Sequence, residues 1–141
     1  MKNIFFIFGL TTLVMSFRLN NDSKLLYRQA LLTHISNLKT DTIYVLKCFD
    51  IELPSKIDKH IIVDISENIN FFLGNSSSLY VIKLMPIELN KGNVEITLID
   101  YILKSNNGEI AMNNTGNVIY SYKYENETGK YKLLKKIKNT I

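Results

Sequence analysis

Three ionisable residues are spaced so that they could form a small acid–base or metal-binding site. They are Asp58, His60 and Asp64, and they lie in or beside an apolar run over residues 60–65. Residues two and four positions apart in a β-strand lie on the same face, so an extended chain would bring the imidazole and both carboxylates together. A carboxylate beside an imidazole can orient it as a general base or share a metal ion with it.

The rest of the sequence offers this group no further partners. No second set of ligands follows at a recognisable spacing, there is no His-Glu-x-x-His motif, and no serine or cysteine stands in a nucleophile arrangement. The alternative is the polar outer face of an antiparallel sheet, and we favour that interpretation. We therefore predict no catalytic residue, no metal site and no cofactor.

A row of tyrosines is the second group with chemical potential. Tyr120, Tyr122 and Tyr124 alternate along one strand-like segment, and Tyr131 lies in the next one. A tyrosine ring combines apolar area with a hydroxyl group, which suits the binding of a peptide or a glycan. The row could form a binding face of that kind, and we name these four tyrosines as its candidate residues. The alternative is that the rings fill the core under a helix while their hydroxyls reach the rim.

The C-terminal segment is basic. Its positive charge could attract nucleic acid or an anionic surface, but only Tyr131 interleaves with the lysines, and the export predicted below separates the chain from nucleic acid. Leu133, Leu134 and Ile137 instead indicate a packed strand whose lysines point outwards and protect a sheet edge from aggregation. We expect no nucleic-acid partner. The lysines concerned are Lys130, Lys132, Lys135, Lys136 and Lys138.

The N-terminus has the pattern of a secretory signal peptide. Lys2 supplies a positive charge, residues 4–14 are apolar, and Val14 and Ser16 form a suitable pair for cleavage after residue 16. The apolar run is about half of the roughly 20 residues that a membrane span needs. We therefore expect a signal peptide over residues 1–16, no stable membrane span after cleavage, and a secreted or periplasmic protein.

Composition predicts one globular domain over residues 17–141. The chain has 141 residues, of which 46% are hydrophobic, and this is enough for a core. Cys48 is the single cysteine, so an intramolecular disulfide is excluded. Its neighbours are apolar, and we expect its side chain to be buried.

The segment after residue 20 should form an amphipathic helix. Apolar residues recur at spacings of three and four between Leu25 and Leu38, and Asn21 or Asp22 is a suitable N-cap. The apolar stripe is broad enough to lie across a sheet, with Leu32 and Ile35 as its anchors. His34 stands beside the stripe, where we expect it to be solvated or to cap the helix.

The remaining chain reads as strands joined by turns. Alternation and β-branched residues predict strands over residues 42–49, 60–65 and 79–85, followed by an antiparallel meander over residues 93–137. Residues 66–73 could be a short helix or a continuation of the preceding strand, and Phe71, Phe72 and Leu73 should be buried in either case. Turns are expected at Asn107-Gly108, at residues 113–117 and at Thr128-Gly129.

One helix followed by about six mostly antiparallel strands is an α+β fold. A helix cradled by a curved meander resembles the cystatin-like or nuclear-transport-factor-2-like architecture in the order of its elements. Such scaffolds host enzymes, inhibitors and binding modules. We favour an exported, non-enzymatic binding or interaction module. The alternative is a small hydrolase or isomerase with a pocket between helix and sheet, using His60.

Overall fold

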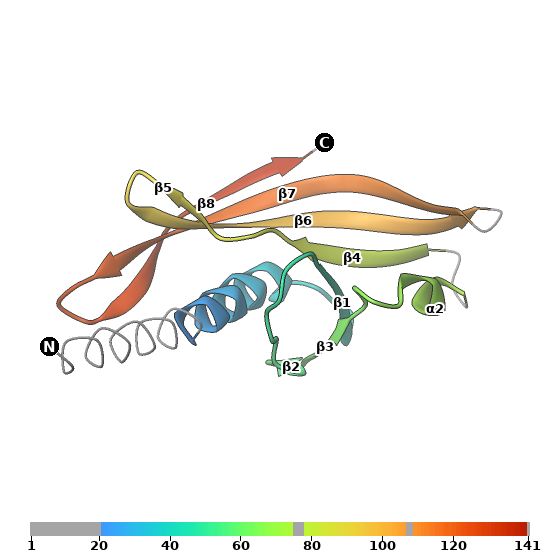
Figure 1. Ribbon diagram of the computed structural model, residues 1–141, viewed down its shortest axis with the longest axis horizontal. Helices are drawn as coiled ribbons and strands as arrows, with labels where there is room; N and C mark the ends of the chain where they lie inside the picture. The colour runs from blue at the N-terminus through green and yellow to red at the C-terminus, as the bar shows by residue number, and fades with distance from the viewer. Residues whose placement is uncertain (1–20, 75–77, 107–108, 141) are drawn as a thin grey trace, which may run out of the picture.

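The computed structural model describes residues 21–74, 78–106 and 109–140. Within these residues the chain is α+β, with two helices and a mixed sheet of eight strands (Figure 1). An N-terminal helix occupies residues 21–35. The other elements are β1 (Thr42–Lys47), β2 (Lys56–Ile57), β3 (His60–Asp64), α2 (Ile69–Leu73), β4 (Ser78–Leu84), β5 (Glu88–Asn90), β6 (Asn93–Asn106), β7 (Glu109–Glu125) and β8 (Lys130–Thr140).

The sheet is rich in antiparallel pairs, as the sequence predicted, but its centre is parallel. The strand order is β2-β3-β1-β4-β6-β7-β8, and β5 pairs with β6. β1 runs parallel to both β3 and β4. The segment containing α2 carries the chain from β3 across β1 to β4, and a parallel pair requires a crossover of this kind. Alternation within one strand does not tell which direction its neighbours run.

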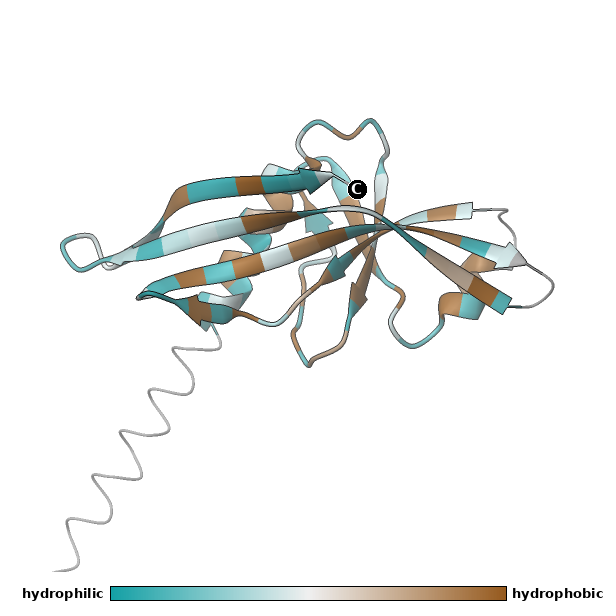
Figure 2. Ribbon diagram, turned by 90° about the horizontal axis from the view of Figure 1, so that it is seen from above, coloured by the Kyte–Doolittle hydropathy of each residue, from teal (hydrophilic) through white to brown (hydrophobic). Residues whose placement is uncertain are grey.

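β6 and β7 form a long, bent hairpin (Figure 1). Their ladder closes at the pair Asn106 and Glu109; the predicted Asn107-Gly108 turn lies outside the described residues. Coloured by hydropathy, the long strands alternate between apolar and polar residues (Figure 2). This alternation gives each strand two faces with different surroundings.

The turn predicted at residues 113–117 is wrong, because β7 passes through this segment without a break. The register shifts between Asp100 and Tyr101, so that Thr115 is accommodated as a bulge in the ladder. Gly116 has a φ of +151°, and a Cβ there would lie 2.9 Å from the backbone oxygen of Asn139. Glycine therefore lets β8 approach β7 closely at this point.

Each face of the sheet carries a buried apolar cluster. The cluster on the α2 side contains Leu73, Ile65, Val81 and Leu103. The larger cluster lies on the other face and includes residues of β1, β4, β6 and β7. From the N-terminal helix it contains Leu26, Tyr27, Ala30, Leu31 and Ile35.

Several side chains that we expected to be buried are exposed. Leu32 follows the buried Leu31 by about 100° around the helix and is 41% exposed. Phe71 is 74% exposed on the outer side of α2, whereas Leu73 of the same short helix is buried. Cys48 is also exposed, because it follows the last residue of β1 in a bend.

Candidate functional site

A partly buried polar network joins the N-terminal helix to three strands. The Nε2–H group of His34 donates to Oδ1 of Asp100 on β6 at 2.7 Å. The hydroxyl of Tyr80 on β4 donates to the same carboxylate oxygen at 2.6 Å. The side chains of His34 and Asp100 are only 7% and 17% exposed. The sequence prediction that His34 would be solvated or capping is therefore wrong.

The other imidazole nitrogen faces a tyrosine. Nδ1 of His34 lies 3.1 Å from the hydroxyl of Tyr120 on β7. Because a carboxylate only accepts hydrogen bonds, Nε2 carries a hydrogen, and a neutral ring then accepts at Nδ1 from the Tyr120 hydroxyl. The two rings also meet edge to face, with centroids 6.2 Å apart. Three hydrogen bonds therefore link the four side chains of the network.

The environment keeps Asp100 ionised and the two tyrosines protonated. Burial alone would raise the pKa of Asp100, but the hydrogen bonds from His34 and Tyr80, with the positive charge of Lys138, outweigh it and hold the pKa below 3.8. Burial, reinforced by the hydrogen bond to Asp100, raises the pKa of the Tyr80 hydroxyl far above its ordinary value. Burial raises the pKa of Tyr120 similarly. At neutral pH both hydroxyls are therefore donors.

The predicted tyrosine face is only partly accessible. Tyr120 and Tyr122 are buried in the larger apolar cluster, where they stand opposite Ile96 and Val94 of β6. A partner cannot reach these rings, which corrects the prediction that they form a binding face. The alternation that we took for a binding face is the side of β7 that points into the core.

The two buried tyrosines differ in what their hydroxyls do, and this gives a matched test. Among the described residues the Tyr122 hydroxyl has no hydrogen-bond partner, and burial raises the pKa of Tyr122 to about 12. Tyr122→Phe should therefore leave the free energy of unfolding unchanged or raise it by up to about 1 kcal/mol. Tyr120→Phe should lower it by about 1 kcal/mol, since the bond to His34 is lost. Urea unfolding curves of both variants measure the difference; equal effects would contradict this assignment of hydrogen bonds.

Asp58, His60 and Asp64 are not brought together by the fold. Asp58 lies exposed in the turn before β3 with a φ of +53°, so the two-residue period of the strand does not reach it. His60 is buried and donates from Nδ1 to the backbone oxygen of Thr40 at 2.6 Å. Asp64 pairs instead with Lys47 at 2.7 Å. The geometry gives no support to an acid–base role for this group.

No group of three or more His, Cys, Asp or Glu side chains within residues 21–74, 78–106 and 109–140 could hold a metal ion. In the pair of His34 and Asp100, both imidazole nitrogens have partners inside the network. That arrangement is suited to fixing the helix relative to the strands.

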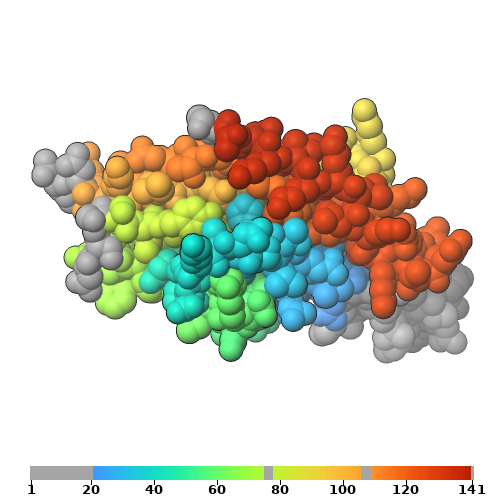
Figure 3. Space-filling view, turned by 180° about the vertical axis from the view of Figure 1, so that it is seen from behind, coloured from blue at the N-terminus to red at the C-terminus, as the bar shows by residue number. Residues whose placement is uncertain are grey.

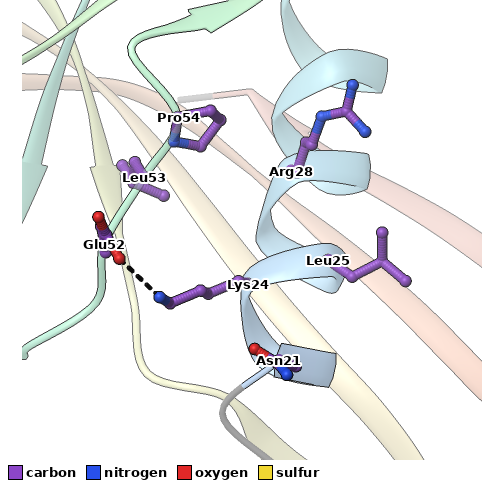
Figure 4. Close-up of a pocket in the computed structure, with 7 residues that line it drawn as sticks. All are labelled: Asn21, Lys24, Leu25, Arg28, Glu52, Leu53 and Pro54. Carbon is purple, nitrogen blue, oxygen red and sulfur yellow. Dashed lines mark hydrogen bonds and ion pairs between the residues drawn. The ribbon is translucent and has the colours of Figure 1, made fainter.

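Surface hollows lie away from this network, and two of them adjoin charged side chains. The first, of about 370 Å³, lies between the start of the N-terminal helix and residues 52–54, and Lys24 reaches across it to Glu52 at 2.7 Å (Figure 4). The second, of about 500 Å³, lies at the end of the β7–β8 hairpin. Its lining residues are Lys123, Tyr124, Glu125, Asn126, Glu127, Lys132 and Leu134.

The β7–β8 hairpin extends beyond the end of β6. The last pair between β6 and β7 is Val94 with Tyr122, whereas β7 and β8 pair as far as Glu125 with Lys130. Within this extension the rings of Tyr124 and Tyr131 meet edge to face, with centroids 5.1 Å apart. Tyr124 is exposed and Tyr131 is half-buried. We call this pair and the adjoining 500 Å³ hollow the hairpin surface.

Comparisons with known protein families, with characterised proteins and with solved structures find no match to this chain. In the described part of the chain, neither helix has the length and apolar character needed to cross a membrane.

Proposed function

We propose that the chain is an exported, non-enzymatic binding or interaction module. On this proposal residues 1–16, which lie outside the described residues, are a signal peptide, and residues 17–141 form the secreted or periplasmic domain. The charged start, the short apolar run and the small residue at position 16 support export. N-terminal sequencing of the native protein should give a start near Phe17; an intact Met1 on soluble cytoplasmic protein would contradict it.

We propose further that the domain uses a scaffold of the cystatin-like or nuclear-transport-factor-2-like kind. Two observations support this: helix residues such as Leu31 share a buried cluster with Leu98 and Val118 of the meander, and β4, β6, β7 and β8 pair antiparallel in order. The parallel pairing of β1 departs from a simple meander. On such a scaffold the helix covers one face of the sheet, and strand ends and hairpins remain for binding.

The observation that carries the binding proposal is the aromatic pair on the protruding hairpin. Tyr124 lines the hollow, and the half-buried Tyr131, which also packs against the larger cluster, meets the Tyr124 ring edge to face on a segment that β6 does not cover. The rim includes the ion pair between Lys132 and Glu125 at 3.4 Å and the amide of Asn126. Aromatic rings flanked by polar groups suit a peptide segment or a glycan outside the cytoplasm.

Replacing both tyrosines tests the proposal. The double variant Tyr124→Ser, Tyr131→Ser should keep the native circular dichroism spectrum, because one ring is exposed and the other half-buried. Ligands should first be found by screening arrays of glycans and of displayed peptides against the wild-type domain, and the variant should lose at least about tenfold in affinity for them. A matched control is Ile61→Ser, Phe71→Ser, which removes two exposed apolar side chains from β3 and α2.

Three results would contradict the proposal. Unchanged capture by the tyrosine variant would exclude the hairpin surface as the binding site. A collapsed spectrum would show that Tyr124 and Tyr131 belong to the core, as Tyr120 and Tyr122 do. Loss of capture in the Ile61→Ser, Phe71→Ser control would move the site to the other end of the sheet.

One observation favours the alternative class, a small hydrolase or isomerase acting between helix and sheet. The pairing of His34 with Asp100 is the kind of contact that orients an imidazole for general-base work. In this reading His34 takes the role that the sequence suggested for His60. Against it, both imidazole nitrogens are engaged within the network, so a substrate would have to displace Tyr120. Hydrolysis of activated esters that is lost in His34→Gln would favour the enzyme.

A further inference from the structure

We propose that the outer edge of β8 binds an acidic peptide segment, which adds to the sheet as a further strand. This proposal goes beyond the hairpin surface, because it uses the backbone and the lysines of β8 in place of the tyrosine pair. It also assigns a use to the basic segment that the sequence indicated only as a protected edge.

The edge of β8 is long and unpaired within the described residues. β8 is the last strand of the sheet and pairs with β7 from Lys130 to Thr140. Among residues 21–74, 78–106 and 109–140, no strand pairs with its other side. Its atoms form an open margin of the molecule beside the N-terminal helix (Figure 3). Such an edge presents a row of backbone donors and acceptors that an extended peptide can pair with.

The charge of this edge points to an acidic partner. β8 has five lysines and no acidic residue in 11 positions. In the described chain Lys132 has one exposed ion pair, with Glu125, and Lys136 lies 5.6 Å from the centre of the Tyr120 ring. No ion pair to Lys130 or Lys135 is formed there. A second copy of the chain would bring five more lysines to the same edge, so self-pairing is opposed by like-charge repulsion.

The lysines lie on both faces of β8, and this favours an added strand over a flat polyanion as the ligand. Lys136 and Lys138 stand beside Tyr120 and Val118, so they project on the face of the larger cluster. Lys135, beside Ser121, projects on the opposite face. A polyanion lying on one face meets only part of this set. A strand added at the edge carries side chains to both faces and can place a carboxylate next to each lysine.

The register of β8 adds an apolar contact to this edge. The β7–β8 ladder shifts between Ser121 and Tyr122, which leaves Leu134 as the extra residue of β8. Leu134 is 52% exposed, and Leu133 beside it is also exposed. Apolar residues of an incoming strand can pack on these leucines while its carboxylates meet the lysines. The preferred segment therefore mixes acidic and apolar residues.

A labelled synthetic peptide tests the proposal by fluorescence anisotropy on the full domain. The probe repeats Glu-Glu-Val-Thr three times, which places carboxylates on both faces of a strand. The variant Lys135→Glu, Lys136→Glu should weaken binding at least about tenfold. The matched control Lys56→Glu, Lys59→Glu makes the same change in net charge at two exposed lysines, one in β2 and one in the turn after it, and should weaken binding less than about threefold. Circular dichroism confirms that each variant is folded.

Backbone methylation separates strand addition from simple charge attraction. Two further peptides have the same sequence and carry N-methyl groups on alternate residues, in one register or the other. In a strand added to β8, only one of these sets of N–H groups points at the protein, so one peptide should lose binding and the other should keep it. A heparin-derived oligosaccharide serves as the flat polyanion and should depend less on the two lysines.

Three outcomes would overturn the proposal. They are no binding of the peptide at low salt, equal binding of both methylated peptides, and an oligosaccharide that binds as tightly as the peptide with the same dependence on Lys135 and Lys136. The Tyr124→Ser, Tyr131→Ser variant should bind the acidic peptide like the wild type. Loss of binding in that variant would place the peptide on the hairpin surface and would contradict the edge site.

Discussion

Leu31→Ala should lower the free energy of unfolding by about 2–5 kcal/mol, whereas Leu32→Ala should lower it by less than about 1 kcal/mol. Leu31 is fully buried in the larger cluster, and Leu32 is 41% exposed on the same helix. Truncating Leu31 leaves a cavity that the neighbouring side chains fill only in part. Truncating Leu32 leaves a space that water can occupy.

The two variants control for each other. Both change leucine to alanine in the interior of one helix, so the change in helix propensity is the same and the difference reports burial alone. Urea unfolding with a shared fit of the m-value measures it. If Leu32→Ala cost as much as Leu31→Ala, the outer face of the helix would also be packed. Ile35→Ala, at the second predicted anchor, should behave like Leu31→Ala because Ile35 is fully buried.

Periodicity predicted the local elements of this chain well. Strands expected over residues 42–49, 60–65 and 79–85 correspond to β1, β3 and β4 with small differences at their ends. Of the two alternatives for residues 66–73, a short helix or a continued strand, the structure has the short helix α2. These elements follow from side-chain alternation and β-branched content, which act within a few residues and are therefore visible in sequence.

Pairing between distant segments could not be predicted in the same way. Residues 113–117 have the composition of a turn, yet β7 continues through them because β6 supplies a long partner and a bulge absorbs the extra residue. His34 looks like a solvated side chain, but its carboxylate partner Asp100 lies 66 residues further along the chain. The alternation of Tyr120 and Tyr122 is the same for a core face and for a binding face. Only the pairing of β7 with β6 and the position of the helix show which of the two faces it is.

The second large effect is expected at Asp100. Asp100→Ala should lower the free energy of unfolding by about 3–5 kcal/mol, because it leaves the Nε2–H of His34 and the hydroxyl of Tyr80 without their acceptor in a largely buried site. The control Glu67→Ala removes an exposed carboxylate from the turn before α2 and should change it by less than about 0.5 kcal/mol. A loss at Asp100 no larger than at Glu67 would mean that the network does not hold the helix.

The carboxylate of Asp100 should also make the free energy of unfolding decrease at acidic pH. Hydrogen bonds from His34 and Tyr80 outweigh burial and hold the pKa of Asp100 in the folded state below 3.8, its value when unfolded. The unfolded chain therefore binds a proton first as the pH falls. The stabilisation is fully present above the unfolded pKa and is lost as the pH falls through the folded pKa. The pKa of Asp64 is also lowered by its contacts with Lys47 and Ser66, which outweigh the opposing effect of burial, so it adds a loss in the same direction.

Asp100→Asn separates the hydrogen bonds that Asp100 accepts from the titration of its charge, since the amide keeps an acceptor oxygen but carries no titratable charge. Unfolding by urea between about pH 2 and pH 6 should give a shallower acid slope for this variant than for the wild type. Adding Asp64→Asn to this variant should make its acid slope shallower still, because the two carboxylates have different partners and act independently. An acid slope unchanged by Asp100→Asn would show that the carboxylate is not held in its ionised form by the helix. In that case the contact between His34 and Asp100 would not contribute to folding.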